Sequence, residues 1–493
     1  MTTTTSPATE SNVSVFTIEE NGIDVIPEAE RKGKASSLFW PWFAANISVF
    51  AVSYGSWILG YGLSFWQATI AALVGTILSF LLVGAVSLAG KRGSAPTMVL
   101  SRAAFGVKGN VAPGILSWIL LVGWETVLVI LATLAAETVI GILAPGVDGN
   151  LVKIIAFIIV LAIIVGAGII GYDLIMKIQT VLTIVCAVVT LGYLILAAGQ
   201  IDLSQIGNLS NGSWSSLLGA TVMVMTALGL GWVNSAADYS RYLPRRTSSG
   251  KVLWWTTFGS SIGPIILIVF GLLLVASQPE GAGSTLAGDL GANPIGALAA
   301  VLPLWYLIPF IIVAVGGLAS GAVLDIYSSG LTLLTIGLPV KRWVGSLIDG
   351  IIMLVGTIAV VWFADDFLTP FQAFLGLVGT PIAAWVGIFL GDMVLRRRDY
   401  DDAALFDAKG RYGSVNWLAV ITMLVLTAIG WGFTASDISW LGWLGYLFPL
   451  FGLDAGAYGY SGFGVLIAIV VAFLVTVIAS RGRIRRQEAS QLG

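Results

Sequence analysis

Histidine is missing from this sequence of 493 residues, cysteine occurs once, and only 10% of the residues are charged. Without histidine the chain has no histidine metal site, no Ser–His catalytic pair and no histidine proton relay. The single cysteine, Cys186, excludes an intrachain disulfide and a cysteine-based metal site. Soluble domains usually carry about 25% charged residues, far more than this chain has. We therefore exclude a soluble enzyme, a nucleic-acid binder and a disordered protein.

What the chain does have is apolar sequence: 57% of its residues are hydrophobic and its mean hydropathy is +0.95. In a bilayer the backbone must satisfy its own hydrogen bonds, so only helices or closed barrels span it. The apolar runs are about 20 residues long, roughly twice the length of a barrel strand. They predict an all-α polytopic membrane protein embedded in the lipid bilayer. The net charge of −2 gives no field that would attract a nucleic acid.

Twelve apolar stretches are long enough to be transmembrane helices. The stretch 436–461, rich in Trp, Tyr and Gly, is instead expected to be an interfacial loop or a half-helix. The polar N-terminal 37 residues are expected to be disordered and, lacking an apolar signal-peptide core, uncleaved. The predicted spans are 38–63, 66–89, 113–143, 151–170, 175–198, 217–235, 252–276, 303–327, 346–364, 370–395, 415–434 and 462–480.

The positive charges agree with this number of spans. If the N-terminus is cytoplasmic, 23 of the 24 Lys and Arg residues lie in segments on the cytoplasmic side, and only Lys153 falls outside. Positive-inside bias alternates with each crossing, so a wrong span count would scatter these charges. The pattern predicts a multi-pass protein of the cell membrane with both termini in the cytoplasm.

Two of the spans contain residues that interrupt an apolar helix. The first has Asn46, Ser48 and other polar or glycine residues between positions 42 and 55, and the sixth has Gly229 and Gly231 between positions 227 and 238. Paired breaks at corresponding positions of two halves indicate a binding site near the midplane. The alternative is that these glycines only pack helices together. Twelve spans with paired breaks favour a solute carrier over a membrane anchor.

Several motifs resemble those of the nucleobase–cation symporter family, in its purine–cytosine permease branch. The most specific is Ala236-Ala-Asp-Tyr-Ser-Arg-Tyr-Leu-Pro244, and the resemblance runs from about residue 36 to about residue 435. The others are Gly62-Leu-Ser-Phe65, Ala104-Phe-Gly-Val-Lys-Gly109, Val122-Gly-Trp124, Asp325-Ile-Tyr-Ser-Ser-Gly-Leu331, Arg396-Arg-Arg-Asp-Tyr400 and Ser414-Val-Asn-Trp417.

The resemblance implies a leucine-transporter-like fold, a five-plus-five inverted repeat with two extra C-terminal helices. Its repeats would be residues 38–198 and 217–395, and its extra helices would lie in 415–480. Residues 1–37 and 481–493 would be the cytoplasmic tails.

The resemblance also implies secondary active uptake of a nucleobase, cytosine or a purine-like ring, coupled to H⁺ or Na⁺ by alternating access without a cofactor. Alternatives are a permease for allantoin, hydantoin or a related heterocycle or vitamin. A channel fits less well, because the polar residues cluster at one depth rather than along a pore. An enzyme is disfavoured, since without histidine only carboxylate chemistry would remain. The oligomeric state is left open.

Trp124 and Glu125 are the first candidate site residues. Trp124 lies about 17 Å along the third span, near mid-bilayer, where its ring can stack on a flat ligand. Glu125, at the same depth, can accept an N–H from the ring or carry a proton, because an unpaired midplane carboxylate is costly. Trp232, beside the break with Gly229 and Gly231, is expected to form the opposite wall. For each residue the alternative is a packing role.

Asp325 is a candidate both for ring binding and for proton coupling. It shares a helix face with two glycines, at positions 317 and 321, and the family often has an amide residue near this point. Asn46 in the first break is a further candidate ligand. Asp238 and Arg241, after the sixth span, resemble the family's gate, or they simply anchor the topology.

The family resemblance also suggests where a sodium ion would bind. One expected hydroxyl is missing, because Gly321 stands in its place. That gap favours proton over sodium coupling, with Glu125 or Asp325 as the carrier. The remaining candidate Na⁺ ligands are Ala45, Ser48, Gly317 and Ser320.

Overall fold

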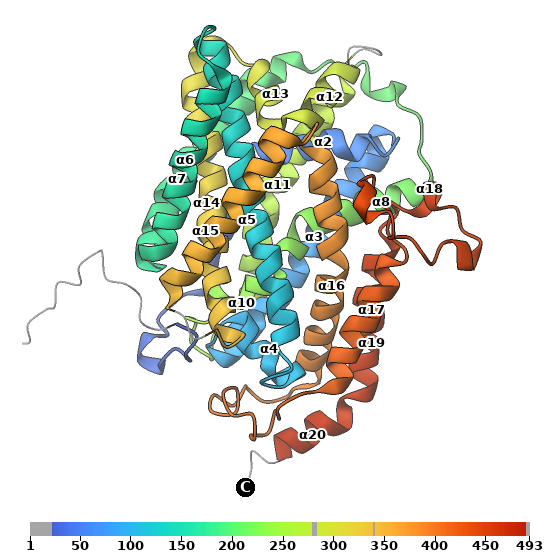
Figure 1. Ribbon diagram of the computed structural model, residues 1–493. Helices are drawn as coiled ribbons and strands as arrows, with labels where there is room; N and C mark the ends of the chain where they lie inside the picture. Colours follow the sequence, from blue (N-terminus) through green and yellow to red (C-terminus); the bar gives the residue numbers. More distant parts are fainter. Residues whose placement is uncertain (1–21, 171, 279–282, 339–340, 490–493) are drawn as a thin grey trace, which may run out of the picture.

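The computed structural model describes residues 22–170, 172–278, 283–338 and 341–489, and throughout these ranges the regular elements are helices. The long helices run side by side along one axis of the molecule (Figure 1). The all-α fold class predicted from the sequence is confirmed. The ends of the two predicted tails, residues 1–21 and 490–493, lie outside the described residues.

Each predicted span has a helical counterpart. In chain order these are α1 (Phe39–Asn46) with α2 (Phe50–Leu59), α3 (Phe65–Gly93), α5 (Val111–Leu143), α6 (Gly149–Ile170), α7 (Tyr172–Ala197), α8 (Trp214–Ala227) with α9 (Gly229–Trp232) and α10 (Ala236–Ser240), α11 (Ser249–Ala276), α14 (Leu307–Thr335), α15 (Arg342–Phe363), α16 (Leu368–Leu395), α17 (Trp417–Trp431) and α19 (Phe463–Ala479). The shorter helices are α4 (Thr97–Phe105), α12 (Gly283–Ala292), α13 (Pro294–Ala300), α18 (Ala455–Tyr458) and α20 (Arg481–Ala489).

Length and hydropathy support most of the twelve spans. Among the described residues, nine helices are long and apolar enough to cross a membrane, or up to eleven if each bent pair counts as one span. The remaining helix, α17, has only 15 residues. The structure is therefore consistent with twelve crossings and supports eleven of them by length.

The stretch 436–461 forms no span. It is a loop with isolated helical turns at Ser439–Leu441 and Pro449–Phe451, followed by the single turn of α18. Trp440 is 68% exposed there. Of the two expectations for this stretch, the loop is correct.

The expectation that the whole N-terminal segment is disordered is wrong for residues 22–37. Ile26 is fully buried and its N–H donates to the Ser94 carbonyl at 2.8 Å. The Gly33 N–H donates to the Tyr242 carbonyl at 3.2 Å. The polar composition suggested disorder, but composition says nothing about the hydrogen-bond partners that other segments of the chain supply to this segment.

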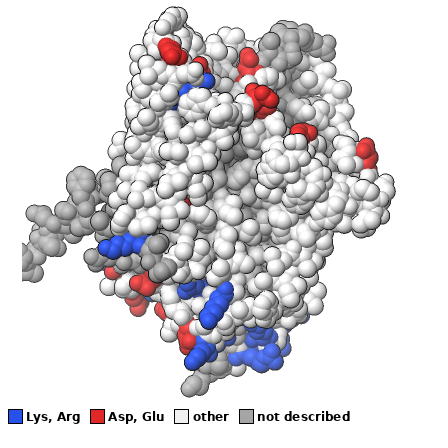
Figure 2. All heavy atoms as spheres, in the orientation of Figure 1, with Lys and Arg blue, Asp and Glu red and all other residues white. Residues whose placement is uncertain are grey.

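One end of the molecule, which we call the basic end, collects most of the visible lysines and arginines (Figure 2). It carries α4 and α20 (Figure 1). There Arg396 is buried, bonds to both carboxylate oxygens of Asp392, and donates to the Ala103 carbonyl and to Gln487. The charge segregation is the one expected if the basic end faces the cytoplasm.

Glycine allows two of the helices to approach backbone to backbone. A Cβ added to Gly271 of α11 would lie 2.0 Å from the Val52 carbonyl oxygen of α2. A Cβ on Gly55 of α2 would lie 2.3 Å from the Leu272 amide nitrogen. Since neither backbone can yield cheaply, these glycines hold α2 in place beside α11.

We expect Gly271→Ala to lower the free energy of unfolding by about 1–3 kcal/mol, the usual cost of overpacking a filled interior. The matched control is Gly141→Ala in α5, where an added Cβ meets nothing within 4 Å. Thermal unfolding of the two purified variants in one detergent measures the difference. Equal melting temperatures would contradict the close contact.

Candidate functional site

The first and sixth spans are both broken, as predicted. Helix α1 ends at Asn46 and α2 begins at Phe50, and their axes are bent by 67°. Helix α8 ends at Ala227, where Leu228 has φ −113° and ψ −100°. At this second break the Gly229 N–H donates to the Ser79 hydroxyl oxygen at 3.2 Å.

A cavity of about 540 Å³ lies against both breaks. Its wall comes from α1, α2, α5, the sixth span and α14. Its combination of aromatic side chains and a few polar groups is typical of a site for a small organic molecule. The lining residues are Ala45, Asn46, Ser48, Phe50, Ala51, Tyr54, Trp124, Leu128, Ala227, Leu228, Trp232, Gly317, Leu318, Gly321 and Asp325.

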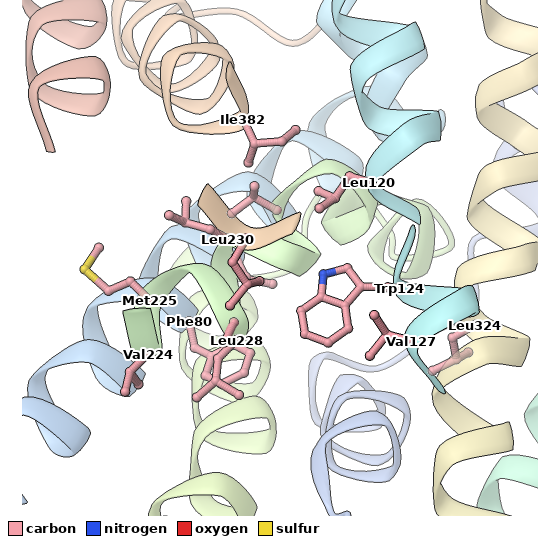
Figure 3. Close-up of a cluster of buried hydrophobic side chains, with 14 of the residues drawn as sticks. Phe80, Leu120, Trp124, Val127, Val224, Met225, Leu228, Leu230, Leu324 and Ile382 are labelled. Atoms are coloured by element: carbon pink, nitrogen blue, oxygen red, sulfur yellow. The ribbon is translucent and has the colours of Figure 1, made fainter. Parts of the chain in front are cut away.

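Aromatic side chains from α5 and from the sixth span line the cavity. Trp124 projects from α5 toward Leu228 (Figure 3), and its ring centroid is 5.6 Å from that of Phe371 in an edge-to-face contact. Trp232, from the sixth span, is packed edge-to-face against Trp42 at 5.7 Å. The structure thus brings together the two tryptophans proposed as walls. Phe371, the ring that contacts Trp124, lies in the predicted span 370–395, and nothing in the sequence around it indicated a place beside the cavity.

Phe50 and Tyr54 are cavity residues that the sequence analysis missed. They stand four residues apart on α2, their rings are 5.2 Å apart, and both line the cavity. Their spacing puts them on one face of a helix. That spacing beside the first break was the available signal.

Gly229 and Gly231 do not line the cavity. A Cβ on Gly229 would lie 2.2 Å from the Ser79 carbonyl carbon, and one on Gly231 would lie 2.7 Å from Nε1 of Trp124. Both glycines make room for a neighbour. Their geometry supports the packing alternative rather than direct contact with a ligand.

The neighbouring residues Trp124 and Glu125 have different surroundings. Glu125 is fully buried, does not line the cavity, and interacts electrostatically with Asp349 and then Asp325. Neither of its carboxyl oxygens has a hydrogen-bond partner among the described residues. Asp325 does line the cavity. The geometry therefore supports ligand contact for Asp325 and not for Glu125.

Asp349 is a buried acid that the sequence analysis did not single out. Its Oδ1 accepts a hydrogen bond from Trp118 Nε1 at 2.8 Å, and its Oδ2 accepts one from the Ser329 hydroxyl at 2.5 Å. The available signal was the single acidic residue within the predicted apolar span 346–364.

The candidate sodium ligands are gathered where α14 passes the first break. Ala45, Ser48 and Gly317 line the cavity, and Ser320 is buried on α14. A Cβ on Gly321 would lie 4.0 Å from the Ala45 carbonyl oxygen. Among the described residues, no group of three or more His, Cys, Asp or Glu side chains could hold a metal ion. Any cation here would depend on backbone carbonyls and hydroxyls. Asn46 lines the same cavity while its amide nitrogen donates to the Trp42 carbonyl at 2.8 Å.

The two gating candidates join the sixth span to its neighbours. Oδ1 of Asp238 accepts hydrogen bonds from the Thr97 N–H and hydroxyl at 2.7 and 2.8 Å, at the start of α4. Arg241 donates to the Tyr327 hydroxyl of α14 at 2.8 Å and to the Gly22 carbonyl at 3.0 Å. Movement of the sixth span would have to break or carry these bonds.

Replacing Asp238 with Ala should destabilise the protein by about 1–3 kcal/mol, since it leaves the buried Thr97 N–H without an acceptor. Thermal unfolding compared with Asp365→Ala, an exposed acid in the loop before α16, measures the effect. A loss no larger than that of Asp365→Ala would show that these bonds do not stabilise this arrangement.

Comparison with known proteins identifies relatives that are permeases. A family model described as "Permease for cytosine/purines, uracil, thiamine, allantoin" matches residues 25–459. YxlA of Bacillus subtilis, assigned as a purine-cytosine permease, is 28% identical over 420 residues, which cover 83% of this chain and 86% of YxlA. The cytosine permease of Escherichia coli K12 is 25% identical over 416 residues, covering 82% and 87%.

The fold also resembles solved transporters. Mhp1, a nucleobase-cation-symport-1 transporter solved closed with bromovinylhydantoin bound, superposes with a TM-score of 0.66 at 19% identity, covering 96% of this chain and 100% of Mhp1. A Na⁺-coupled sialic acid symporter superposes with a TM-score of 0.60 at 12% identity, covering 93% and 91%.

Proposed function

The chain belongs to the family of permeases for cytosine and purines, uracil, thiamine and allantoin, and from that membership we propose that it takes up a nucleobase or a closely related heterocycle. The observation that carries the proposal is the cavity at the paired helix breaks, which Trp124 and Trp232 both line. Two aromatic faces suit a flat ring. The protein acts as a carrier and not as an enzyme, and it uses no cofactor.

The polar groups of the cavity give the ring its orientation. Asn46 and Asp325 come from different spans and line the same space. A nucleobase presents N–H donors and carbonyl acceptors at its edge, which an amide and a carboxyl group can pair. Stacking then supplies affinity for flat rings in general, and these few groups choose among them.

Transport proceeds by alternating access around this site. We assign the basic end to the cytoplasm by the positive-inside rule, which puts both termini inside. The bonds of Asp238 and Arg241 lie at that end and tie the sixth span to α4 and α14. Opening toward the cytoplasm requires these bonds to rearrange while the two broken helices keep their contact with the ligand.

A hydantoin or allantoin is the second candidate substrate. It is favoured by the resemblance to Mhp1, which binds bromovinylhydantoin. Uptake of a panel of radiolabelled cytosine, adenine, hypoxanthine, uracil, allantoin and hydantoin, in cells that lack their own carriers, distinguishes the candidates. Saturable uptake with counterflow of one panel compound supports the carrier. Uptake of none would contradict the proposed function.

Trp124→Ala should weaken binding of the transported panel compound by about 1–3 kcal/mol, the usual contribution of stacking a base on an aromatic side chain. That corresponds to about one to two decades in Kd. Trp124→Phe should lose less, because it keeps an aromatic face. The matched control is Trp254→Ala, whose side chain is 60% exposed on α11. Wild-type affinity in a well-folded Trp124→Ala protein would remove this residue from the site.

We further propose that the coupling ion is H⁺, carried by the buried acids, and not Na⁺. The proposal is supported by the missing hydroxyl at Gly321 and by the burial of Glu125 and Asp325. Desolvation disfavours a charged carboxyl group, so such a group binds a proton from outside and releases it when the site opens to water on the other side.

Uptake should therefore rise as external pH falls and collapse with a protonophore. Glu125→Gln should keep substrate exchange but lose accumulation against a gradient, because only the proton step is removed. Glu137→Gln, twelve residues further along α5, is the matched control. Proteoliposome uptake that follows a sodium gradient at fixed pH, without response to a proton gradient, would refute H⁺ coupling. It would point instead to Ala45, Ser48, Gly317 and Ser320 as ion ligands.

A further inference from the structure

Three acidic side chains are buried close together on three different spans. Glu125 of α5 and Asp349 of α15 are fully buried, and Asp325 of α14 is 2% exposed. Glu125 interacts electrostatically with both aspartates. Ionised carboxylates without cations beside them are costly at this depth. The arrangement therefore needs a positive partner.

Among the side chains that the structure describes, the charged residues on the packed helices do not supply that partner. Arg102 of α4 donates to the Leu405 and Thr335 carbonyls. The one lysine of α6 is Lys153, in its first turn, about 22 Å along the helix from Gly168, which packs on α15 beside Ser346. On α16, Asp392 is already paired with Arg396. On α14, the Tyr327 hydroxyl accepts from Arg241. Helices α9 and α13, which also contact α5, contain no charged residue. A proton is the positive partner that fits.

Hydrogen bonding makes Glu125 and Asp349 unlike each other. Asp349 accepts from Trp118 and from Ser329, and donors of this kind stabilise a carboxylate. Among the described residues neither carboxyl oxygen of Glu125 has a partner with hydrogen-bond geometry, although the Ser329 hydroxyl lies near enough to act on it. The geometry suits a protonated Glu125 beside an ionised Asp349, with the Ser329 hydroxyl next to both.

The polar side chains beside these acids form a series between the cavity and the basic end. Asp325 lines the cavity, and Ser329 lies one helical turn nearer the basic end on α14. Asp349 bonds to Ser329. Ser346, one turn nearer the basic end on α15, is buried with no hydrogen-bond partner for its hydroxyl among the described residues. The polar series thus leads from the cavity toward the basic end, beside the space that would hold the ligand.

We propose that Glu125 and Asp349 carry the coupling proton along a route that starts at Asp325 in the cavity wall and then leaves the cavity, with Asp349 as the residue that releases it toward the cytoplasm. Glu125 gives its proton to the Asp349 carboxylate and becomes a carboxylate itself. Asp325 then gives its proton to Glu125 and takes up another from the cavity when the cavity is open to the outside, and Asp349 releases one proton at the basic end. Each transfer moves one proton between two carboxyl groups and changes no other bond. The inference rests on the proposed H⁺-coupled uptake.

A first experiment needs no substrate. Infrared difference spectra of the reconstituted protein between acidic and alkaline buffer report the C=O stretch of protonated carboxyl groups. Asp349→Asn and Glu125→Gln should each remove one component of that band. Asp365→Asn, an exposed acid just beyond α15, should leave the buried-acid components intact. A band in Asp349→Asn identical to that of the wild type would overturn the proposal.

A second experiment uses the radiolabelled panel in proteoliposomes with an inward proton gradient. A gradient of about one pH unit can sustain about tenfold accumulation in the wild type. In Asp349→Asn the ratio should fall to about one, with exchange and half-saturation unchanged, because Asp349 does not line the cavity. Asp349→Glu should restore part of the accumulation, which separates proton carriage from a folding defect.

The outcomes separate this inference from the proposed function. Proton-driven accumulation retained in a folded Asp349→Asn protein overturns the relay and leaves the carrier intact. Accumulation driven only by sodium in the wild type overturns the relay, again without touching heterocycle uptake. If no panel compound is taken up, the proposed function fails, and the infrared spectra still decide whether Glu125 and Asp349 bind and release protons.

Discussion

A helix inside a bilayer can be interrupted only where surrounding protein satisfies the freed backbone groups. Both breaks in this chain meet that constraint. At the second break the Gly229 N–H uses the Ser79 hydroxyl. At the first, the Phe50 N–H donates to the Ser48 hydroxyl oxygen at 3.3 Å. The cavity lies against both breaks. The helices around it separate the interrupted backbone from the outer surface that would contact lipid.

The same constraint explains the aromatic character of the cavity. Broken helices leave space at their ends, and large flat side chains enclose it with few polar atoms. Trp232 packs on Trp42, which packs in turn on Tyr239, and the Tyr239 hydroxyl donates to the Leu324 carbonyl at 3.1 Å. One wall of the cavity is therefore connected to the segment just before the basic end.

Acidic residues play different parts in this structure according to their partners. Asp392 is held by the buried Arg396 and helps to tie α16 to α4 and α20. Asp238 accepts two hydrogen bonds at the start of α4. Among the described residues, neither a cation nor a donor with hydrogen-bond geometry contacts the carboxyl oxygens of Glu125. The hydrogen bonds of Asp392 and Asp238 stabilise the structure. An acid without a cation or a hydrogen-bond donor can exchange a proton at low structural cost.

The sequence by itself determined the membrane-embedded all-α class, the approximate positions of the spans and the two breaks, because hydropathy, glycine and polar interruptions are local properties of the chain. It did not determine which way Glu125 points. Successive residues on a helix differ by about 100° in direction, so Trp124 faces the cavity while Glu125 faces α14 and α15.

The same limit applies to Asp349 and to residues 22–37. In the sequence, Asp349 is a single acid in an apolar run. Its hydrogen bonds to Trp118 and Ser329 exist only because α15 packs beside α5 and α14. Ile26 lies in a polar segment of the sequence, and its buried position depends on contacts such as the hydrogen bond from its N–H to the Ser94 carbonyl. Burial and hydrogen bonding at these positions depend on neighbours distant in the chain, and only the packing of the helices decides which neighbours those are.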